Sequence, residues 1–479
     1  MIILLILFIA LILLIAGFFA LYKYKNQRPQ PDYFEYYKTQ DKVPAGKVGV
    51  FLTSLIMPEQ HVHEFWYNIT HKVFNAVVPW PFRILAFRDN GVALFDPAHL
   101  HAREKFSPTR LEDPFGSDCD HDGFPYIEKY KQGKVSWVPP SKFIYLDPGY
   151  FVYKGRKGGD PTIVGKLANY SRLYYYDEGI IQKKCPHWQG SFEIIKGAFE
   201  KLKQRYPDVE YRAESSLFHY AMKRKIHELL DAGCDTIVIV ALMTIYSHFE
   251  EFNSSVRHSF EFIHEWEKEH PGKKIKVIIA PQIGDFQPMR QAFLEMLKDR
   301  LDTLPEGSDV FVAVTVHGMP WDSFQWEAWL QLAPPYRDKL FEECQELMKQ
   351  YKFGRTKVVV CQDEFSDPVW DPKEKYLSTN RAYWSAINEG YDYAIGLPIE
   401  FLAENTDTMM HHAMKCYENF DQYDVEAPVD YPDWSVPYTR EMVQGKTRVI
   451  YNGLPVGKYK KHVIEALCQA VGSVLSNKR

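Results

Sequence analysis

A single histidine ends an apolar run near the middle of the chain. The stretch FVAVTVHGMPW starts as β-branched residues typical of a buried strand and stops at His317, before Gly318, Met319 and Pro320. A neutral imidazole can accept a proton or bind a divalent metal ion. Ligands of open α/β sheets bind outside the carboxyl ends of the strands, so this position suits a catalytic group. Taken alone, however, His317 is better interpreted as a capping histidine bonded to a neighbouring loop.

A carboxylate and a second imidazole occur together further along the chain. In PIEFLAENTDTMMHHAMKCYENF, Asp407 and His411 are four residues apart, so on a helix they would share one face with Met410 and Met414. Such a pair can hold a divalent ion or shuttle protons. An acid favoured by the helix dipole and an unrelated surface histidine explain the spacing equally well.

An acidic stretch, DCDHDGFPYIE, partly matches a calcium-binding loop. Asp118, Asp120 and Asp122 provide the alternating carboxylates of the first half of such a loop. Lys129 stands where a bidentate glutamate is needed, and Pro125 disturbs the loop backbone. We therefore favour a solvated acidic turn over a calcium site.

Short apolar runs alternate with amphipathic stretches through most of the chain, which predicts βα units and parallel sheets. Strands are predicted at 47–53, 236–242, 274–280, 310–316, 357–361 and 393–399. Helices are predicted at 216–232, 250–269, 286–301, 336–351, 376–389 and 461–475. The pattern favours an α/β fold with two doubly wound, Rossmann-like halves.

These elements divide the chain into five parts. We predict a transmembrane anchor at 1–22, a linker at 23–45, a first α/β domain at 46–272, a second α/β domain at 273–425 and a C-terminal extension with a closing helix at 426–479. The first domain carries an insertion around 85–185 that is rich in Pro, Gly, Asp and Tyr. The second domain carries His317 and Asp407.

The first 22 residues, MIILLILFIALILLIAGFFALY, contain no charged side chain. The segment is long enough to cross ~30 Å of hydrocarbon as a helix. It lacks a basic n-region and exceeds the ~7–15 apolar residues of a signal peptide. Lys23, Lys25 and Arg28 follow it, so the positive-inside rule puts the globular part in the cytoplasm. The sequence therefore predicts a single-pass protein of the cell membrane.

Composition excludes several classes of function. With a net charge of −5, the chain lacks the excess of positive charge that would bind the phosphates of nucleic acid. The 7 cysteines are scattered without a CxxC pair, which argues against a zinc ribbon or an iron–sulfur cluster. No Gly-x-Gly-x-x-Gly follows the first strand, which disfavours a dehydrogenase.

Several motifs, taken in order, resemble the ferrochelatases, the class II chelatase family. The family's strand-ending His-Gly/Ser-Leu-Pro element is similar to HGMP, and its Pro-Ile-x-Phe-x-Ser-Asp-His-x-Glu-Thr-Leu element is similar to PIEFLAENTDTM. Its Gln-Ser-x-x-Gly-Pro-x-x-Trp loop is similar to residues 362–370, and an upstream Tyr-Ser pair falls on Tyr246 and Ser247. The resemblance covers most of residues 47–420.

The resemblance implies insertion of Fe(II) into a free-base porphyrin, with haem as the product. His317 would accept a pyrrole proton, and Asp407 would help to move protons or handle the metal. The implied metal contacts are His317, Asp407 and His411, and the implied substrate contacts are Tyr246, Ser247, Trp370 and Met410. Iron is then a substrate, and no prosthetic group is expected. Membrane contact through residues 1–22 is expected, and a homodimer is left open.

The chain departs from the family at its second catalytic position. The family's glutamate is Asp407, one methylene shorter, its preceding histidine is Asn405, and an acidic position further down the helix is His411. Catalytic reach is sensitive to about 1 Å, so altered activity is one consequence. Two alternatives stay open: a non-catalytic haem- or tetrapyrrole-binding homologue, and a chelatase for another metal and tetrapyrrole.

Overall fold

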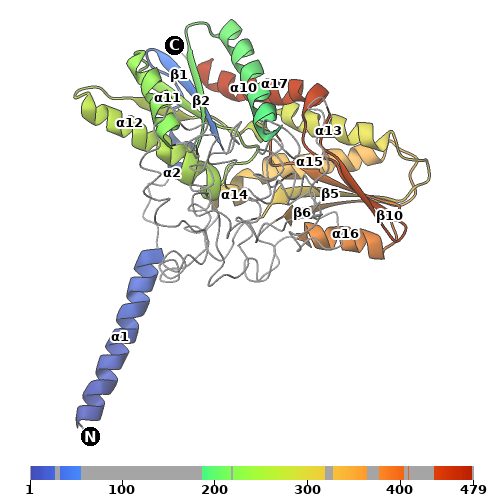
Figure 1. Ribbon diagram of the computed structural model, residues 1–479, viewed down its shortest axis with the longest axis horizontal. Coiled ribbons are helices and arrows are strands. Elements are labelled where there is room, and N and C mark those ends of the chain that lie inside the picture. The colour runs from blue at the N-terminus through green and yellow to red at the C-terminus, as the bar shows by residue number, and fades with distance from the viewer. Residues whose placement is uncertain are drawn as a thin grey trace, which may run out of the picture.

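The computed structural model of the protein describes residues 2–26, 33–54, 186–216, 219–318, 327–363, 377–403, 408 and 436–476. Within these residues the strands form two sheets (Figure 1). The first sheet has the order β2-β1-β3-β4 and is parallel throughout. Its strands are β1 (Val48–Ser54), β2 (Glu210–Ser215), β3 (Thr236–Ala241) and β4 (Lys276–Ile279). Every residue of β3 is buried, as expected for a central strand covered on both faces.

The second sheet has the order β7-β6-β5-β8-β10-β9. Its strands are β5 (Val310–His317), β6 (Thr356–Asp363), β7 (Leu377–Ser378), β8 (Tyr393–Pro398), β9 (Arg440–Gln444) and β10 (Thr447–Tyr451). Only β9 runs antiparallel to its neighbour, through a tight turn in which Gly445 has a φ of 61°. β5 lies between β6 and β8 and is therefore protected on both edges.

One apolar core joins the two sheets. It contains one face of β1 and β3, one face of β5 and β8, and side chains from the helices that lie between them. These helices are α10 (Pro186–Arg205), α13 (Gln287–Leu301), α15 (Pro334–Met348) and α17 (Lys460–Leu475). The C-terminal helix α17 packs against both α10 and α13, so it ties the end of the chain to both halves.

Other helices cover the remaining faces of the sheets. The second face of the first sheet packs against α2 (Tyr33–Thr39), α11 (His219–Asp231) and α12 (Arg257–Glu269). α16 (Thr379–Asn388) packs against β5, β6 and β8, and α14 (Glu327–Leu332) contacts α15. The described part of the chain also contains three short elements: η4 (His248–Val256), η5 (Ile283–Asp285) and η7 (Gly457–Tyr459). Helices on both faces of parallel sheets confirm the predicted α/β fold.

The N-terminal helix α1 (Ile2–Asn26) points away from the two sheets in Figure 1. Its large apolar side chains are exposed wherever they are described, and Leu14 for example is 71% exposed. Among the helices of the described residues, none meets both the length and the apolarity needed to cross a bilayer. The predicted transmembrane segment at 1–22 is therefore not supported by the structure.

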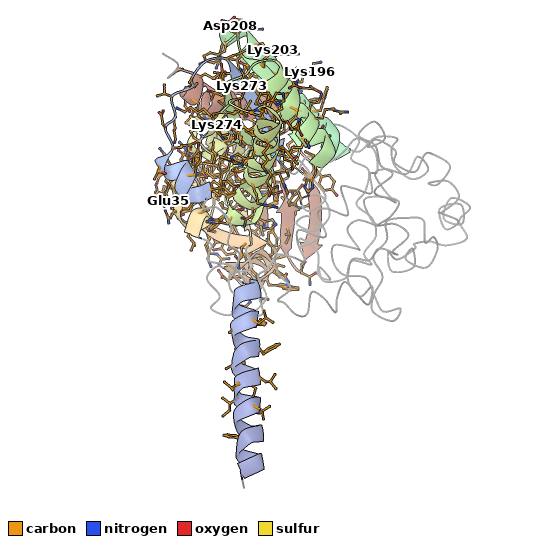
Figure 2. The ribbon with its side chains drawn as sticks, turned by 90° about the vertical axis from the view of Figure 1, so that its left-hand side faces the viewer. Glu35, Lys196, Lys203, Asp208, Lys273 and Lys274 are labelled. Carbon is orange, nitrogen blue, oxygen red and sulfur yellow. The ribbon has the colours of Figure 1, made fainter. Side chains whose placement is uncertain are left out.

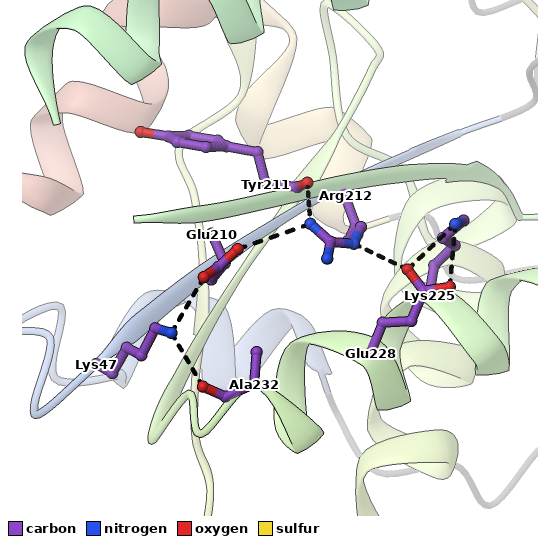
Figure 3. A network of polar contacts seen from close by, with 7 residues as sticks. All are labelled: Lys47, Glu210, Tyr211, Arg212, Lys225, Glu228 and Ala232. Atoms are coloured by element: carbon purple, nitrogen blue, oxygen red, sulfur yellow. Dashed lines mark hydrogen bonds and ion pairs between the residues drawn. The ribbon is translucent and has the colours of Figure 1, made fainter. Parts of the chain in front are cut away.

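Polar contacts hold the edge strand β2 in place (Figure 3). Lys47 Nζ contacts Glu210 at 3.0 Å, and Arg212 Nε donates to Glu228 of α11 at 2.9 Å. Lys225, one turn before Glu228 on α11, lies 3.1 Å from the same carboxylate. These pairs are partly exposed, so they contribute orientation more than free energy of folding.

The six predicted strands correspond to β1, β3, β4, β5, β6 and β8. β4 pairs with β3, so the first sheet extends past residue 272, where the sequence placed the domain boundary. The predicted helix at 250–269 is a π-helix up to Val256, and α12 begins at Arg257. The insertion around 85–185, with its acidic stretch, lies outside the described residues.

Candidate active site

The carboxyl ends of β5, β6 and β8 meet at one edge of the second sheet. In the parallel register His317 pairs with Asp363 of β6, and Thr315 pairs with Pro398 of β8. All residues of β5 are buried except His317, which is half-buried. The burial of the strand fixes the backbone of His317 while leaving part of its side chain accessible.

Hydrogen bonding defines which nitrogen of His317 is basic. Nδ1 lies 2.6 Å from the carbonyl oxygen of Gly318. Because a carbonyl can only accept, Nδ1 carries the proton, and Nε2 is the basic nitrogen of the neutral ring. The ring meets Phe401 edge-on, with centroids 5.9 Å apart. His317 is thus a half-buried imidazole with a fixed tautomer.

A buried carboxylate lies directly behind His317. Glu400 Oε2 accepts the backbone N–H of His317 at 2.5 Å, and Oε1 accepts the indole N–H of Trp329 at 2.9 Å. Burial raises the pKa of the Glu400 carboxyl, while His317, the two N–H donors and Arg337 act in the opposite direction. Sequence reasoning did not select this residue, although a carboxylate right after an apolar strand was a signal for it.

The loop after β3 brings the first sheet to the same place. Thr244 donates its hydroxyl to the carbonyl oxygens of Ile399 at 3.0 Å and Glu400 at 2.9 Å. Its backbone N–H also donates to Glu400 O at 3.3 Å. The carboxyl ends of both sheets therefore converge on the segment that follows β8.

Tyr246 and Ser247, predicted as substrate contacts, lie in this same loop. Tyr246 has no exposed surface, and its hydroxyl accepts the backbone N–H of Ala241 at 3.2 Å. Burial raises its pKa well above the ordinary value. Ser247 is also buried, and its hydroxyl donates to Glu251 Oε2 at 2.9 Å. The loop thus reaches the second sheet at Thr244, while the Tyr246 ring packs into the core of the first sheet.

The remaining predicted site residues are Asp407, His411, Met410 and Trp370, and all lie outside the described residues. Their separation from His317 is therefore a prediction. Within the part of the chain that is described, no group of three or more His, Cys, Asp or Glu side chains is arranged to hold a metal ion. His317 and the convergent ends of the two sheets are the described portion of the candidate site.

A separate groove of about 540 Å³ runs along the edge strand β2. Its lining includes the α10 side chains Phe192 and Phe199, Tyr211 of β2, and charged residues of both signs such as Lys196 and Glu200. Lys196 and Lys203 are both on the exposed face of α10 (Figure 2). None of the predicted catalytic or substrate residues lines this groove, so its volume does not mark the candidate active site.

The ferrochelatase family model matches residues 174–433, more than half of the 479-residue chain. The chain belongs to the ferrochelatase family. The match begins just before α10 and contains His317, Glu400 and Asp407. β1 precedes the matched region, yet it occupies a central position of the first sheet and completes it.

Solved structures give weaker likenesses. SirB from Bacillus subtilis with Fe3+ is 13% identical, with a TM-score of 0.35 over 60% of this chain and 90% of that one. A TorS sensor domain–TorT complex without ligand is 9% identical, with a TM-score of 0.26 over 61% and 86%. A putative branched-chain amino acid ABC transporter from Silicibacter pomeroyi is 10% identical, with a TM-score of 0.23 over 60% and 75%. No curated protein matches the chain significantly. At these TM-scores the three likenesses say nothing about its substrate.

Proposed function

We propose that this chelatase-family protein inserts Fe(II) into a porphyrin at the carboxyl edge of the second sheet. The observation that carries the proposal is the half-buried His317 at the end of the central strand β5, with its Nδ1–H donating to the carbonyl oxygen of Gly318. In this proposal Nε2 accepts a pyrrole proton, and Asp407 moves protons or handles the entering metal.

The reaction requires a base because two pyrrole N–H protons must leave as the metal enters the macrocycle. An imidazole can accept one of these protons on a ring nitrogen. Because Nδ1–H is hydrogen-bonded to the carbonyl oxygen of Gly318, the ring does not turn this nitrogen toward the porphyrin. Phe401 is buried beside the imidazole and contacts it edge-on, so it supports the position of the ring.

An anaerobic insertion assay with several porphyrins and divalent metals tests the proposal. His317→Ala is expected to lower kcat by about 10²-fold or more, the usual contribution of a general base. His270→Gln is the matched control, because His270 is an exposed histidine at the end of α12, on the first sheet. Equal activity of the His317→Ala variant and the wild-type protein would refute the role of His317.

The same assay separates the alternatives. A chain that binds a porphyrin or haem but inserts no metal is a tetrapyrrole-binding homologue. Insertion of a metal other than iron, or into another tetrapyrrole, identifies a different chelatase; a set of Co(II), Ni(II), Zn(II) and Fe(II) with protoporphyrin and sirohydrochlorin covers these cases. Binding of metal through both His317 and His411 is the outcome expected of a cobalt or nickel enzyme.

We also propose that residues 1–22 attach the protein to the cell membrane with its globular part in the cytoplasm. The exposed apolar side chains of α1 and the lysines that follow it support this. The test compares the full chain with a chain lacking residues 2–22 in membrane fractions washed at alkaline pH. Recovery of both chains in the wash would refute attachment.

A further inference from the structure

We infer that Glu400 is the positioning residue of His317: its carboxylate holds the end of β5 against Trp329 and so fixes where the imidazole lies. The inference rests on the proposed function of His317. Its basis is geometric, because the two carboxylate oxygens receive two different N–H donors, the backbone N–H of His317 at 2.5 Å and the indole N–H of Trp329 at 2.9 Å.

Each of the two carboxylate oxygens accepts one of these N–H groups, so both oxygens are needed. Glu400 is 2% exposed and Trp329 is fully buried, so water does not replace either bond. An amide of the same size offers one acceptor oxygen and one NH₂ donor. A glutamine at this position would therefore face one of the two N–H groups with another donor, although its shape would fit.

The backbone of Glu400 is itself held by two further elements. Thr244, from the loop after β3, donates to the Glu400 carbonyl oxygen at 2.9 Å. Tyr336 of α15 donates its hydroxyl to the preceding carbonyl, that of Ile399, at 2.7 Å. The backbone that carries the carboxylate is thus hydrogen-bonded to the loop after β3 and to α15. The carboxylate in turn binds the backbone N–H of His317 and restrains that residue.

This arrangement matters because His317 is the last residue of β5. On the β6 side residue 317 is still paired with Asp363, but on the β8 side the pairing ends at Thr315, so there no strand neighbour restrains the backbone of residue 317. A displacement of about 1 Å between reacting groups can lower a rate about 10²-fold. The buried carboxylate of Glu400 supplies a restraint on the β8 side of residue 317, where the strand pairing has ended.

The experiment is a double-mutant cycle on Glu400 and Trp329 in the full chain. Glu400→Gln should lower kcat about 10-fold or more with little change in KM, because the base is displaced while the binding walls stay. Trp329→Phe removes one donor and should have a smaller effect. In the double variant the glutamine oxygen can face His317 and its NH₂ no longer meets the indole donor, so kcat should recover at least about threefold relative to Glu400→Gln.

A second measurement does not depend on activity. In protein labelled with ¹⁵N-histidine, the His317 backbone amide, assigned by its loss in His317→Ala, should resonate far downfield because it donates to a carboxylate. The signal should move upfield in Glu400→Gln and partly return in the double variant. If Glu400→Gln does not fold, the double variant is compared with Trp329→Phe instead: the positioning role predicts an upfield shift of the His317 amide and a lower kcat in the double variant, and no difference between the two overturns it.

The outcomes separate the inference from the proposed function. An amide shift that is unchanged in Glu400→Gln, or a kcat equal to that of the wild-type protein in the folded variant, overturns the positioning role. A double variant that is no better than Glu400→Gln in both kcat and amide shift also overturns it. If no metal is inserted by any variant but the amide shifts follow the cycle, the proposed function fails while the restraint on His317 stands.

Discussion

Thr244, at the carboxyl end of the first sheet, donates its hydroxyl to the carbonyl oxygen of Glu400, at the carboxyl end of the second sheet, over 2.9 Å. Both residues are buried, and the bond joins segments that are 156 residues apart in the sequence. It links the loop of β3 to the residue that holds His317. The position of the candidate base is therefore coupled to the packing of one sheet against the other.

Replacing Thr244 with valine should weaken this connection. The variant keeps the shape of the side chain but leaves the buried carbonyls of Ile399 and Glu400 without the hydroxyl donor, which should cost about 1–2 kcal/mol of unfolding free energy. Urea unfolding measures the loss. Thr303→Val is the control, because the Thr303 hydroxyl donates to Arg300 O at an exposed helix end. Equal losses of unfolding free energy in the two variants would show that the buried hydrogen bond stabilises the protein no more than the exposed one.

A methyl group at Gly284 should disturb Thr244 and Tyr336, the two residues that bind the segment after β8. An ideal Cβ there would lie 2.4 Å from the carbonyl oxygen of Thr244 and 2.7 Å from the Tyr336 ring. Gly284→Ala should therefore destabilise the protein by about 1–3 kcal/mol and lower metal insertion, since both neighbours bind the segment after β8. Gly472→Ala, on α17, meets only the Tyr206 hydroxyl at 3.3 Å and should be neutral or slightly stabilising. A Gly284→Ala variant with the same melting temperature as the wild-type protein would contradict the close approach of Gly284 to Thr244 and Tyr336.

The pH dependence of stability should include a contribution from Asp309, at the start of β5. The backbone N–H and the guanidinium of Arg355 both donate to this carboxylate and lower its pKa below the ordinary value of 3.8. A folded-state pKa below the unfolded one gives stability that is present above about pH 3.8 and is lost as the pH falls through the folded value. The stability difference between wild type and Asp309→Asn should thus shrink on acidification.

Urea unfolding of both proteins between pH 3 and pH 6 tests this sign. Asp208→Asn, at an exposed turn before β2, is the matched control (Figure 2). A difference between wild type and Asp309→Asn that grows as the pH falls would be inconsistent with the lowered pKa.

A buried arginine provides a prediction about the helical layer. The Arg290 side chain is 6% exposed, and its Nε lies 3.0 Å from Glu343, which is 29% exposed. Glu343→Ala would leave the guanidinium buried without this partner, and we expect a loss of about 2 kcal/mol, below the full cost of breaking a wholly buried pair. Glu346→Ala, on the same helix, removes an exposed pair with Lys349 and should cost less than about 0.5 kcal/mol. Thermal melting of the two variants gives the comparison.

The sequence by itself determined the elements whose signal is local. β5 was recognisable because a run of β-branched residues fills a strand that is buried on both faces, and the change to His317 and Gly318 marks where it ends. The family could also be recognised, because the order of its motifs does not depend on distances in space. The same local reasoning missed β2, whose residues EYRAES alternate as an edge strand does and carry too few apolar side chains to be distinguished from a loop.

Only the tertiary structure decided which polar groups meet. Glu400 looks like one more acidic residue in the sequence, and its role depends on Trp329 and His317, which come from other elements. Tyr246 likewise belongs to a family motif, but whether its ring faces a ligand or the core depends on how the loop after β3 packs against α2 and η4. Hydrogen bonds and burial of this kind join residues far apart in the chain, and no periodicity within one segment encodes them.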